Sequence, residues 1–232
     1  MTFHRARFGW FALALLFLLL AWDASGLDMA LARWAGGPDG FALRNHWLLT
    51  RVLHDAVKAL AWAFTLLLCL GVVWPRGPLQ ALPFARRLQL PLMVLLASAA
   101  ISVLKATSAT SCPWDMAEFG GVARHLSHWS GWFVADGGGG HCFPAGHATT
   151  GFAFVGGYFA LRRHLPRLAR VWLVLALATG LALGLVQQLR GAHFMSHTLS
   201  KAGPAGSLRP RTAGRRASRA SSRSTPSTTC GS

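Results

Sequence analysis

The segments Lys105–Pro113 (KATSATSCP), Pro144–His147 (PAGH) and Arg190–His197 (RGAHFMSH) decide the fold, because each stands at one end of a long apolar run. A helix needs about 20 residues, within a range of about 17–25, to cross a bilayer. The runs of apolar residues are Phe8–Trp22, Ala59–Pro75, Leu88–Leu104, Pro144–Leu161 and Val171–Leu189. The last four have this length, and the chain is 53% hydrophobic. The sequence therefore predicts an all-α, polytopic membrane helix bundle.

The first apolar run is shorter and has two interpretations. Arg5 and Arg7 precede it and Ala24, Ser25 and Gly26 follow it, which is also the pattern of a cleaved signal peptide. Its length and its tryptophan-containing apolar face favour a retained membrane anchor.

The loop charges orient the predicted helices. Arginine gathers on one side of the bilayer if the runs alternate in direction, and the seven acidic residues all fall on the other side. Excess arginine marks the cytoplasmic face. The polar segments that contain Lys105, His147 and His193 therefore face outward, to the periplasm of a bacterial inner membrane. The formal charge of +16 resides in the cytoplasmic loops and the last 32 residues, which leaves no basic face for nucleic acid.

Three regions follow along the chain. Residues 1–58 hold the anchor and an outward segment in which Phe41–Lys58 has the pattern of an interfacial amphipathic helix. Residues 59–199 form the membrane core. Residues 200–232 are rich in Arg, Ser, Ala and Thr and predict a disordered basic tail, which is either genuine or the product of a frameshift that removes a sixth span.

The polar segments carry groups that bind phosphate and move protons. Lys105 supplies a cation at a helix end, and Gly146 lets the backbone approach an anion closely. Arg190, His193 and His197 share one helical face by their spacing, and imidazoles transfer protons or attack phosphorus. A pair of histidines four residues apart could also bind a metal, but no third ligand has a suitable spacing.

The order and spacing of these segments resemble the type 2 phosphatidic acid phosphatase superfamily over about residues 59–199. The family pattern is Lys-x6-Arg-Pro, Pro-Ser-Gly-His and Ser-Arg-x5-His-x3-Asp. The matching residues are Lys105-x6-Cys112-Pro113, Pro144-Ala145-Gly146-His147 and Gln187-x5-His193-x3-His197. The resemblance implies a helix bundle of the phosphatase/haloperoxidase type and a metal-independent hydrolase of phosphoric monoesters or diphosphates, with no cofactor.

The resemblance also implies roles for individual residues. His193 is the nucleophile that forms a phospho-histidine, and His147 is the general acid for the leaving group. Lys105, with the backbone of Ala145 and Gly146, holds the phosphoryl oxygens. The substrate is a membrane lipid phosphate, and the bilayer itself is the other partner.

The sequence departs from the family pattern at several positions. Cys112 and Gln187 replace phosphate-binding arginines, and Arg190 is placed to restore one cation. His197 stands where an aspartate would stabilise the nucleophile, so Asp115 or Asp136 from the outward loop is expected to fill that role. These changes keep alternatives open, namely a non-catalytic membrane protein that binds phosphate or metal, a lipid phosphotransferase and a vanadate-dependent haloperoxidase.

Two cysteines adjoin the first two motifs. Cys112 and Cys142 lie in the outward loop, and paired thiols outside the cytoplasm usually oxidise. We therefore expect a disulfide between them that ties the Lys105 segment to the His147 turn.

Overall fold

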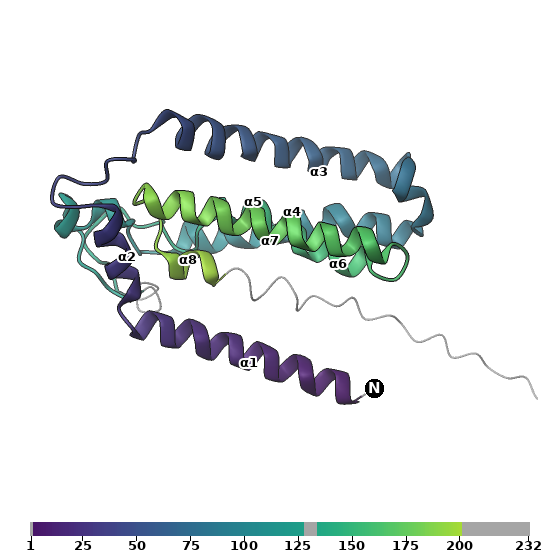
Figure 1. The fold of residues 1–232 in the computed structure, drawn as a ribbon, viewed down its shortest axis with the longest axis horizontal. Helices are drawn as coiled ribbons and strands as arrows, with labels where there is room; N and C mark the ends of the chain where they lie inside the picture. The colour runs from purple at the N-terminus through teal and green to yellow at the C-terminus, as the bar shows by residue number, and fades with distance from the viewer. Residues whose placement is uncertain (1, 128–133, 201–232) are drawn as a thin grey trace, which may run out of the picture.

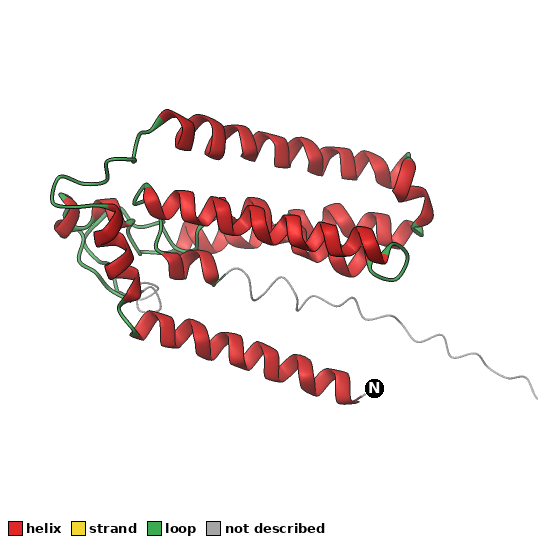
Figure 2. Ribbon diagram, viewed as in Figure 1, coloured by secondary structure: helices red, strands yellow, loops and turns green. Residues whose placement is uncertain are grey.

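The computed structural model describes residues 2–127 and 134–200, and over these ranges the regular secondary structure consists of helices and two isolated β-bridges, joined by loops (Figures 1 and 2). The α-helices are α1 (Thr2–Ala24), α2 (Leu27–Ala35), α3 (Val57–Val73), α4 (Phe84–Thr107), α5 (Gly146–Phe152), α6 (Gly156–Leu161), α7 (Pro166–Leu189) and α8 (Met195–Leu199). A π-helix, Leu48–Ala56, runs directly into α3, and short 3-10 turns are Gly77–Ala81, Pro113–Asp115, Ala117–Phe119 and Ala153–Val155. The predicted all-α fold is confirmed.

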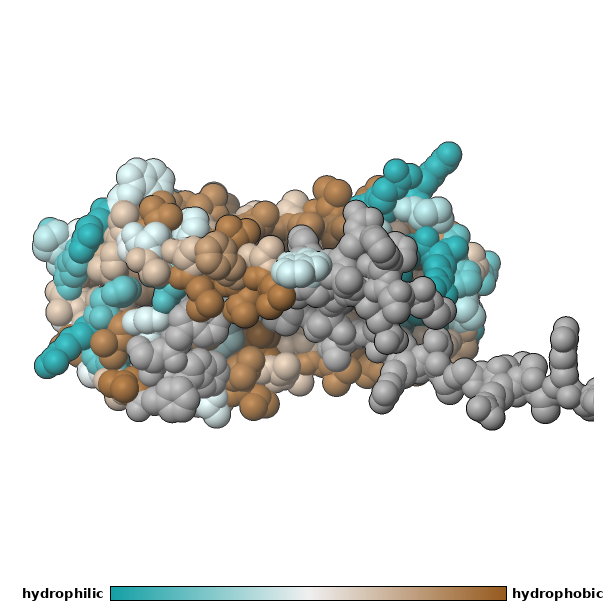
Figure 3. Space-filling view, turned by 90° about the horizontal axis from the view of Figure 1, so that it is seen from below, coloured by the Kyte–Doolittle hydropathy of each residue, from teal (hydrophilic) through white to brown (hydrophobic). Residues whose placement is uncertain are grey.

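Among the described residues, three helices are long and apolar enough to cross a membrane: Leu48–Val73, Phe84–Thr107 and Pro166–Leu189. The run Pro144–Leu161 forms a fourth rod in the same bundle, but a 3-10 turn divides it into α5 and α6 (Figure 1). Many large apolar side chains of α3 and α7 point outward, and a hydrophobic band separates two hydrophilic ends (Figure 3). Such a band is the surface that lipid tails cover, so this is a membrane protein.

The start of the first of these spans differs from the prediction. The structure contains no helix over Phe41–Lys58 as a whole: residues 41–46 form turns, and the helix that begins near Leu48 continues unbroken to Val73. The apolar spacing of residues 48–58 therefore belongs to the outer end of a membrane helix. Phe41 is buried against Phe119, with ring centroids 4.9 Å apart, so it packs inside the protein and does not face lipid. The predicted interfacial helix is wrong.

Small residues bring α5 against α7. A side chain at Gly151 would collide with the backbone of Gly180, and one at Gly180 would collide with Phe152. Glycine at such a crossing lets two helix backbones approach closely, which is how helices associate inside a membrane. Trp172 of α7 donates its Nε1–H to the carbonyl of Phe154 at 2.6 Å. Together these contacts fix the start of α5 beside the end of α7.

Helix α1 lies to one side of the bundle in Figure 1. Its end is tied to the core by Asp28, a buried carboxylate that accepts hydrogen bonds from Trp22 Nε1 at 2.9 Å and from the Ser196 amide at 3.0 Å. Asp28 thereby joins α1, α2 and the start of α8. The predicted tail falls outside the described residues from residue 201 onward.

Candidate active site

The structure brings the three polar segments together at one end of the bundle. Lys105 ends α4, and its Nζ would lie 3.8 Å from a Cβ placed on Gly146, at the start of α5. The rings of His147 and His193 have centroids 5.9 Å apart. Two imidazoles, an ammonium and a backbone turn without a side chain thus surround one small volume. This is the arrangement that the motif spacing predicts.

The turn after α7 places His193. Gly191 has a φ of 71°, a left-handed conformation that glycine adopts without strain, and a side chain there would collide with Phe41. The Gly191 carbonyl accepts a hydrogen bond from the Trp114 amide at 2.9 Å. The amides of Ala192 and His193 both donate to the carbonyl of Gln187. The backbone that carries the imidazole is therefore held from both sides.

His197 has different surroundings from the aspartate whose position it occupies in the family pattern. It is fully buried, and its ring packs edge-on against Phe143 at 5.0 Å and Phe194 at 5.4 Å between centroids. The His193 and His197 centroids are 6.0 Å apart. A ring among aromatic faces supplies packing but no negative charge at this position.

Arg190 and Gln187 lie one turn apart at the end of α7. Arg190 Nη1 donates to Gln187 Oε1 at 3.2 Å, and its Nε donates to the Arg44 carbonyl at 3.0 Å. Partial burial lowers the pKa of the Arg190 guanidinium from its ordinary value, although Asp55 acts in the opposite direction. An arginine remains charged at neutral pH. Arg190 is therefore a fixed cation, and Gln187, which is buried, holds it rather than the substrate.

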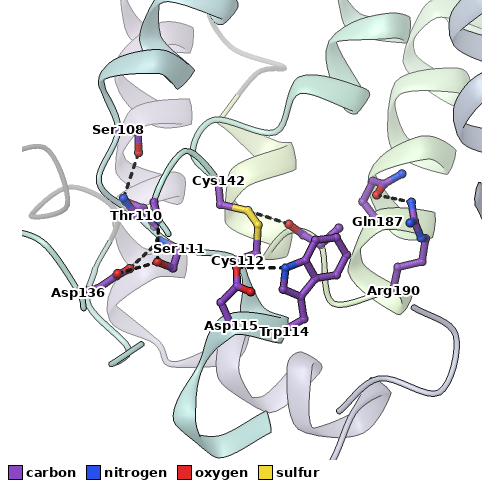
Figure 4. The surroundings of a disulfide bond; sticks show 12 residues. Ser108, Thr110, Ser111, Cys112, Trp114, Asp115, Asp136, Cys142, Gln187 and Arg190 are labelled. Atoms are coloured by element: carbon purple, nitrogen blue, oxygen red, sulfur yellow. Dashed lines mark hydrogen bonds between the residues drawn. A yellow bond between two sulfur atoms is a disulfide. The ribbon is translucent and has the colours of Figure 1, made fainter. Parts of the chain in front are cut away.

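The two carboxylates expected to support His193 have structural partners in the outward loop. Asp136 is buried and accepts hydrogen bonds from the Ser111 amide at 2.6 Å, the Ser111 hydroxyl at 2.7 Å and the Gly138 amide at 3.0 Å (Figure 4). Asp115 accepts one from Trp114 Nε1 at 3.1 Å. Both fix the loop around the first motif. Their assignment to the nucleophile stays an untested expectation.

Cys112 and Cys142 form a disulfide in the structure, with Cα atoms 5.1 Å apart (Figure 4). The Cys142 sulfur lies 3.1 Å from the carbonyl oxygen of Ala192, directly before His193. The bridge therefore touches all three motifs. Since Cys112 is bonded and partly buried, the position of the missing arginine is occupied by a neutral structural group.

Sequence reasoning missed residues at the start of α3 that reach the same volume. The rings of His54 and His147 have centroids 3.9 Å apart. His54 Nδ1 lies 2.6 Å from Asp55 Oδ1. Lys58 lines a cavity of about 200 Å³ together with Lys105, Gly146 and His147. The sequence does hold one sign of them: His54, Asp55 and Lys58 adjoin an apolar run, and ionisable side chains in a membrane helix are costly and usually functional.

No three or more His, Cys, Asp or Glu side chains lie together in a way that could hold a metal ion, within the part of the chain that the structure describes. The pair His193 and His197 therefore gains no third protein ligand from residues 2–127 and 134–200. Whether a metal affects activity is left to experiment.

Comparison with known proteins places this site in a family. No curated protein matches the chain in sequence. The chain is similar in structure to "the first transmembrane PAP2 type phosphatidylglycerolphosphate phosphatase from Bacillus subtilis", with a TM-score of 0.52 and 17% identity over 84% of this chain and 90% of that one. At this identity the likeness shows the fold. The model of the PAP2 superfamily matches residues 87–200, which include all three motifs, and this segment of the chain belongs to that superfamily.

Proposed function

We propose that this protein is a phosphatase of the bacterial inner membrane that hydrolyses a lipid phosphate or pyrophosphate at the periplasmic face. The observation that carries the proposal is the pair His147 and His193, 5.9 Å apart between ring centroids, beside the ammonium of Lys105. Lys105 and Arg190 supply the positive charge that a phosphate dianion requires.

The proposed reaction has two steps. In the first, a ring nitrogen of His193 attacks phosphorus, the bond from phosphorus to the lipid oxygen breaks, and His147 gives a proton to that oxygen. In the second, His147 takes a proton from water, which attacks the phospho-histidine and releases inorganic phosphate and free His193. Replacing this water by a lipid alcohol would turn the same intermediate into a phosphotransfer.

The binding of phosphate without hydrolysis is the second candidate. The features that favour it are His197, which brings no negative charge to His193, and Cys112, which is held in a disulfide instead of supplying a cation. A site with the shape of the family and fewer charges would still attract an anion. The two candidates differ in whether phosphate is released.

Phosphate release from purified protein tests the function. The substrates are a diacylglycerol phosphate, a polyprenyl diphosphate and a phosphorylated acylated sugar, each in mixed micelles with and without a chelator. The proposal expects release from at least one substrate, insensitivity to chelation and inhibition by vanadate. Activity that disappears with chelator and returns with zinc would favour a metal site instead.

Reporter fusions test the membrane side. A periplasm-dependent phosphatase reporter fused after residue 120 should be active, and one fused after residue 165 should be inactive, because the arginine-rich loops mark the cytoplasmic face. The opposite pattern would put the motifs in the cytoplasm and overturn the proposed location.

A further inference from the structure

The outer end of the first membrane span closes one wall of the active site. His54 lies in the π-helical segment Leu48–Ala56, and its ring is 3.9 Å from that of His147 between centroids, closer than the His147–His193 pair. π-helical turns are rare and frequently mark functional sites. The two rings are tilted by 44° to each other, and this close contact limits how far the His147 ring can turn.

Asp55 fixes the orientation of His54. The Asp55 carboxylate lies 2.6 Å from His54 Nδ1, a geometry in which the ring donates Nδ1–H to the carboxylate. The same carboxylate lies 3.6 Å from Arg51, and it is close enough to Arg190 to act on that guanidinium. Asp55 is thus a negative charge joined to the imidazole that contacts the proposed general acid.

Lys58 follows His54 by one helical turn and shares its face. Its side chain lines the cavity of about 200 Å³ between α3, α4 and α5, together with Lys105, Gly146 and His147. Among the described residues, none of the ion pairs involves Lys58 or Lys105. Two ammonium groups in one partly enclosed, largely apolar cavity repel each other. An anion between them removes that repulsion, so the pair is a built site for phosphate oxygens.

We propose that His54, Asp55 and Lys58 form a fourth element of the active site, in which Lys58 binds the phosphate of the substrate and the Asp55-held ring of His54 positions His147. This inference rests on the proposed function for the role of His147. Lys58 supplies a cation from α3, whereas the position of one family arginine is held by Cys112 in the disulfide. The Asp55–His54 pair brings a carboxylate to the imidazole cluster. This carboxylate lies near His147, the proposed general acid, and not near His193, the proposed nucleophile.

Binding of orthovanadate, a phosphate mimic, tests Lys58 without requiring turnover. Titration calorimetry is run on full-length protein in nanodiscs with wild type, Lys58→Ala and Lys58→Arg. Loss of one charged contact should weaken vanadate by about 10–100-fold in Lys58→Ala, and Lys58→Arg should recover most of it. The control is Arg163→Ala, which removes an exposed cation from the turn after α6. It should bind within about 2-fold of wild type, as expected for a surface charge.

A choice of leaving group tests His54. His147 protonates the leaving oxygen in the first step, so formation of the phospho-histidine depends on it for an alkyl phosphate and not for p-nitrophenyl phosphate. A misplaced acid should slow the single-turnover release of the alkyl leaving group by roughly 10–100-fold in His54→Ala, with little change in the p-nitrophenol burst. Asp55→Ala should show the same selectivity. Asp55→Asn, which still accepts the hydrogen bond from His54, should restore much of the activity.

The outcomes separate this inference from the proposed function. Vanadate affinity equal in wild type and Lys58→Ala overturns the role of Lys58, whether or not the protein hydrolyses lipids. Equal losses on both leaving groups in His54→Ala mean a structural role and overturn positioning. A wild type that hydrolyses neither substrate overturns the proposed function and the role of His54 together. Lys58-dependent vanadate binding in that same protein would leave the fourth element standing as an anion site.

Discussion

The two walls of the candidate active site differ in whether their residues belong to a sequence motif of the family. One wall is made by the ends of α4 and α7 and the start of α5, which carry Lys105, Gln187 and His147 at family spacings. The other is made by His54 in the π-helix and Lys58 at the start of α3, where no family motif is present. The first wall is held by a disulfide and buried hydrogen bonds, whereas the second rests on a helix whose outward side is exposed.

On the proposed function, a neighbouring helix supplies charges that the changed motifs lack. Motif residues are tied to the backbone turns that present them, so a change at Cys112 or His197 removes a charge that no adjacent residue can replace. Helix α3 lines the same cavity as Lys105 and His147, and it can contribute charged side chains without altering those turns. The following changes test whether the motif wall dominates, in order of expected effect.

The largest loss is expected for His193→Ala. Removing the atom that attacks phosphorus should lower kcat/KM by at least about 10⁴-fold, as for other nucleophile deletions. Initial rates of phosphate release measure it. The control is His125→Ala, because His125 is exposed and its ring contacts Phe194 without being part of either wall. Residual activity above a tenth of wild type would remove His193 from the mechanism.

His147→Ala should follow. Its loss should slow the single-turnover release of an alkyl leaving group by about 10²–10⁴-fold and the p-nitrophenol burst much less. The ratio of the two rates in wild type and variant is the measurement. An unchanged ratio would mean that His147 binds the substrate or has a structural role and does not protonate the leaving group. It would also contradict the proposal that His54 positions His147 as the acid.

Much of the motif wall could be predicted from the sequence, because apolar runs fix where helices end and polar residues at those ends must meet on one side of a bilayer. The pairing of Cys112 with Cys142 follows from the same reasoning, and the structure has this bridge. The sequence also predicts that Lys105 and Gly146 lie near each other, but it does not give the distance between them.

The second wall could not be predicted, since it depends on where the first span begins. The apolar spacing of residues 41–58 fits a helix lying on the membrane as well as one crossing it, and only packing against α5 distinguishes them. The burial of His197 among aromatic rings and the use of Asp136 by Ser111 also depend on tertiary contacts. Spacing along the chain carries no information about such partners.

Loss of the disulfide should have an intermediate effect. Cys112→Ser with Cys142→Ser opens a loop with a sequence separation of 30. The free energy of unfolding should fall by up to about 3–4 kcal/mol on the chain-entropy account. Thermal unfolding in detergent measures it, with Cys69→Ser as the control because Cys69 is a free thiol. Equal stability, or two freely alkylated thiols in protein purified without reductant, would contradict a structural bridge.

The smallest loss is expected for Gly191→Ala. An added Cβ is strained at a φ of 71° and meets the Phe41 ring, which should lower the free energy of unfolding by about 1–2 kcal/mol. Activity should fall with it, since His193 is two residues away. Gly139→Ala is the matched change, because a Cβ there meets nothing within 4 Å. Equal unfolding midpoints for the two variants would show that the Gly191 turn does not hold the motif wall.

Trapping the intermediate tests the central claim most directly. Wild-type protein is mixed with its best lipid phosphate, quenched in alkali within one turnover, digested and mapped by mass spectrometry. The account predicts an acid-labile phosphoryl group on His193, absent in His193→Ala and accumulating in His147→Ala with a p-nitrophenyl substrate. Rapid phosphate release with no phosphorylated His193, or with the phosphoryl group on another residue, would contradict it.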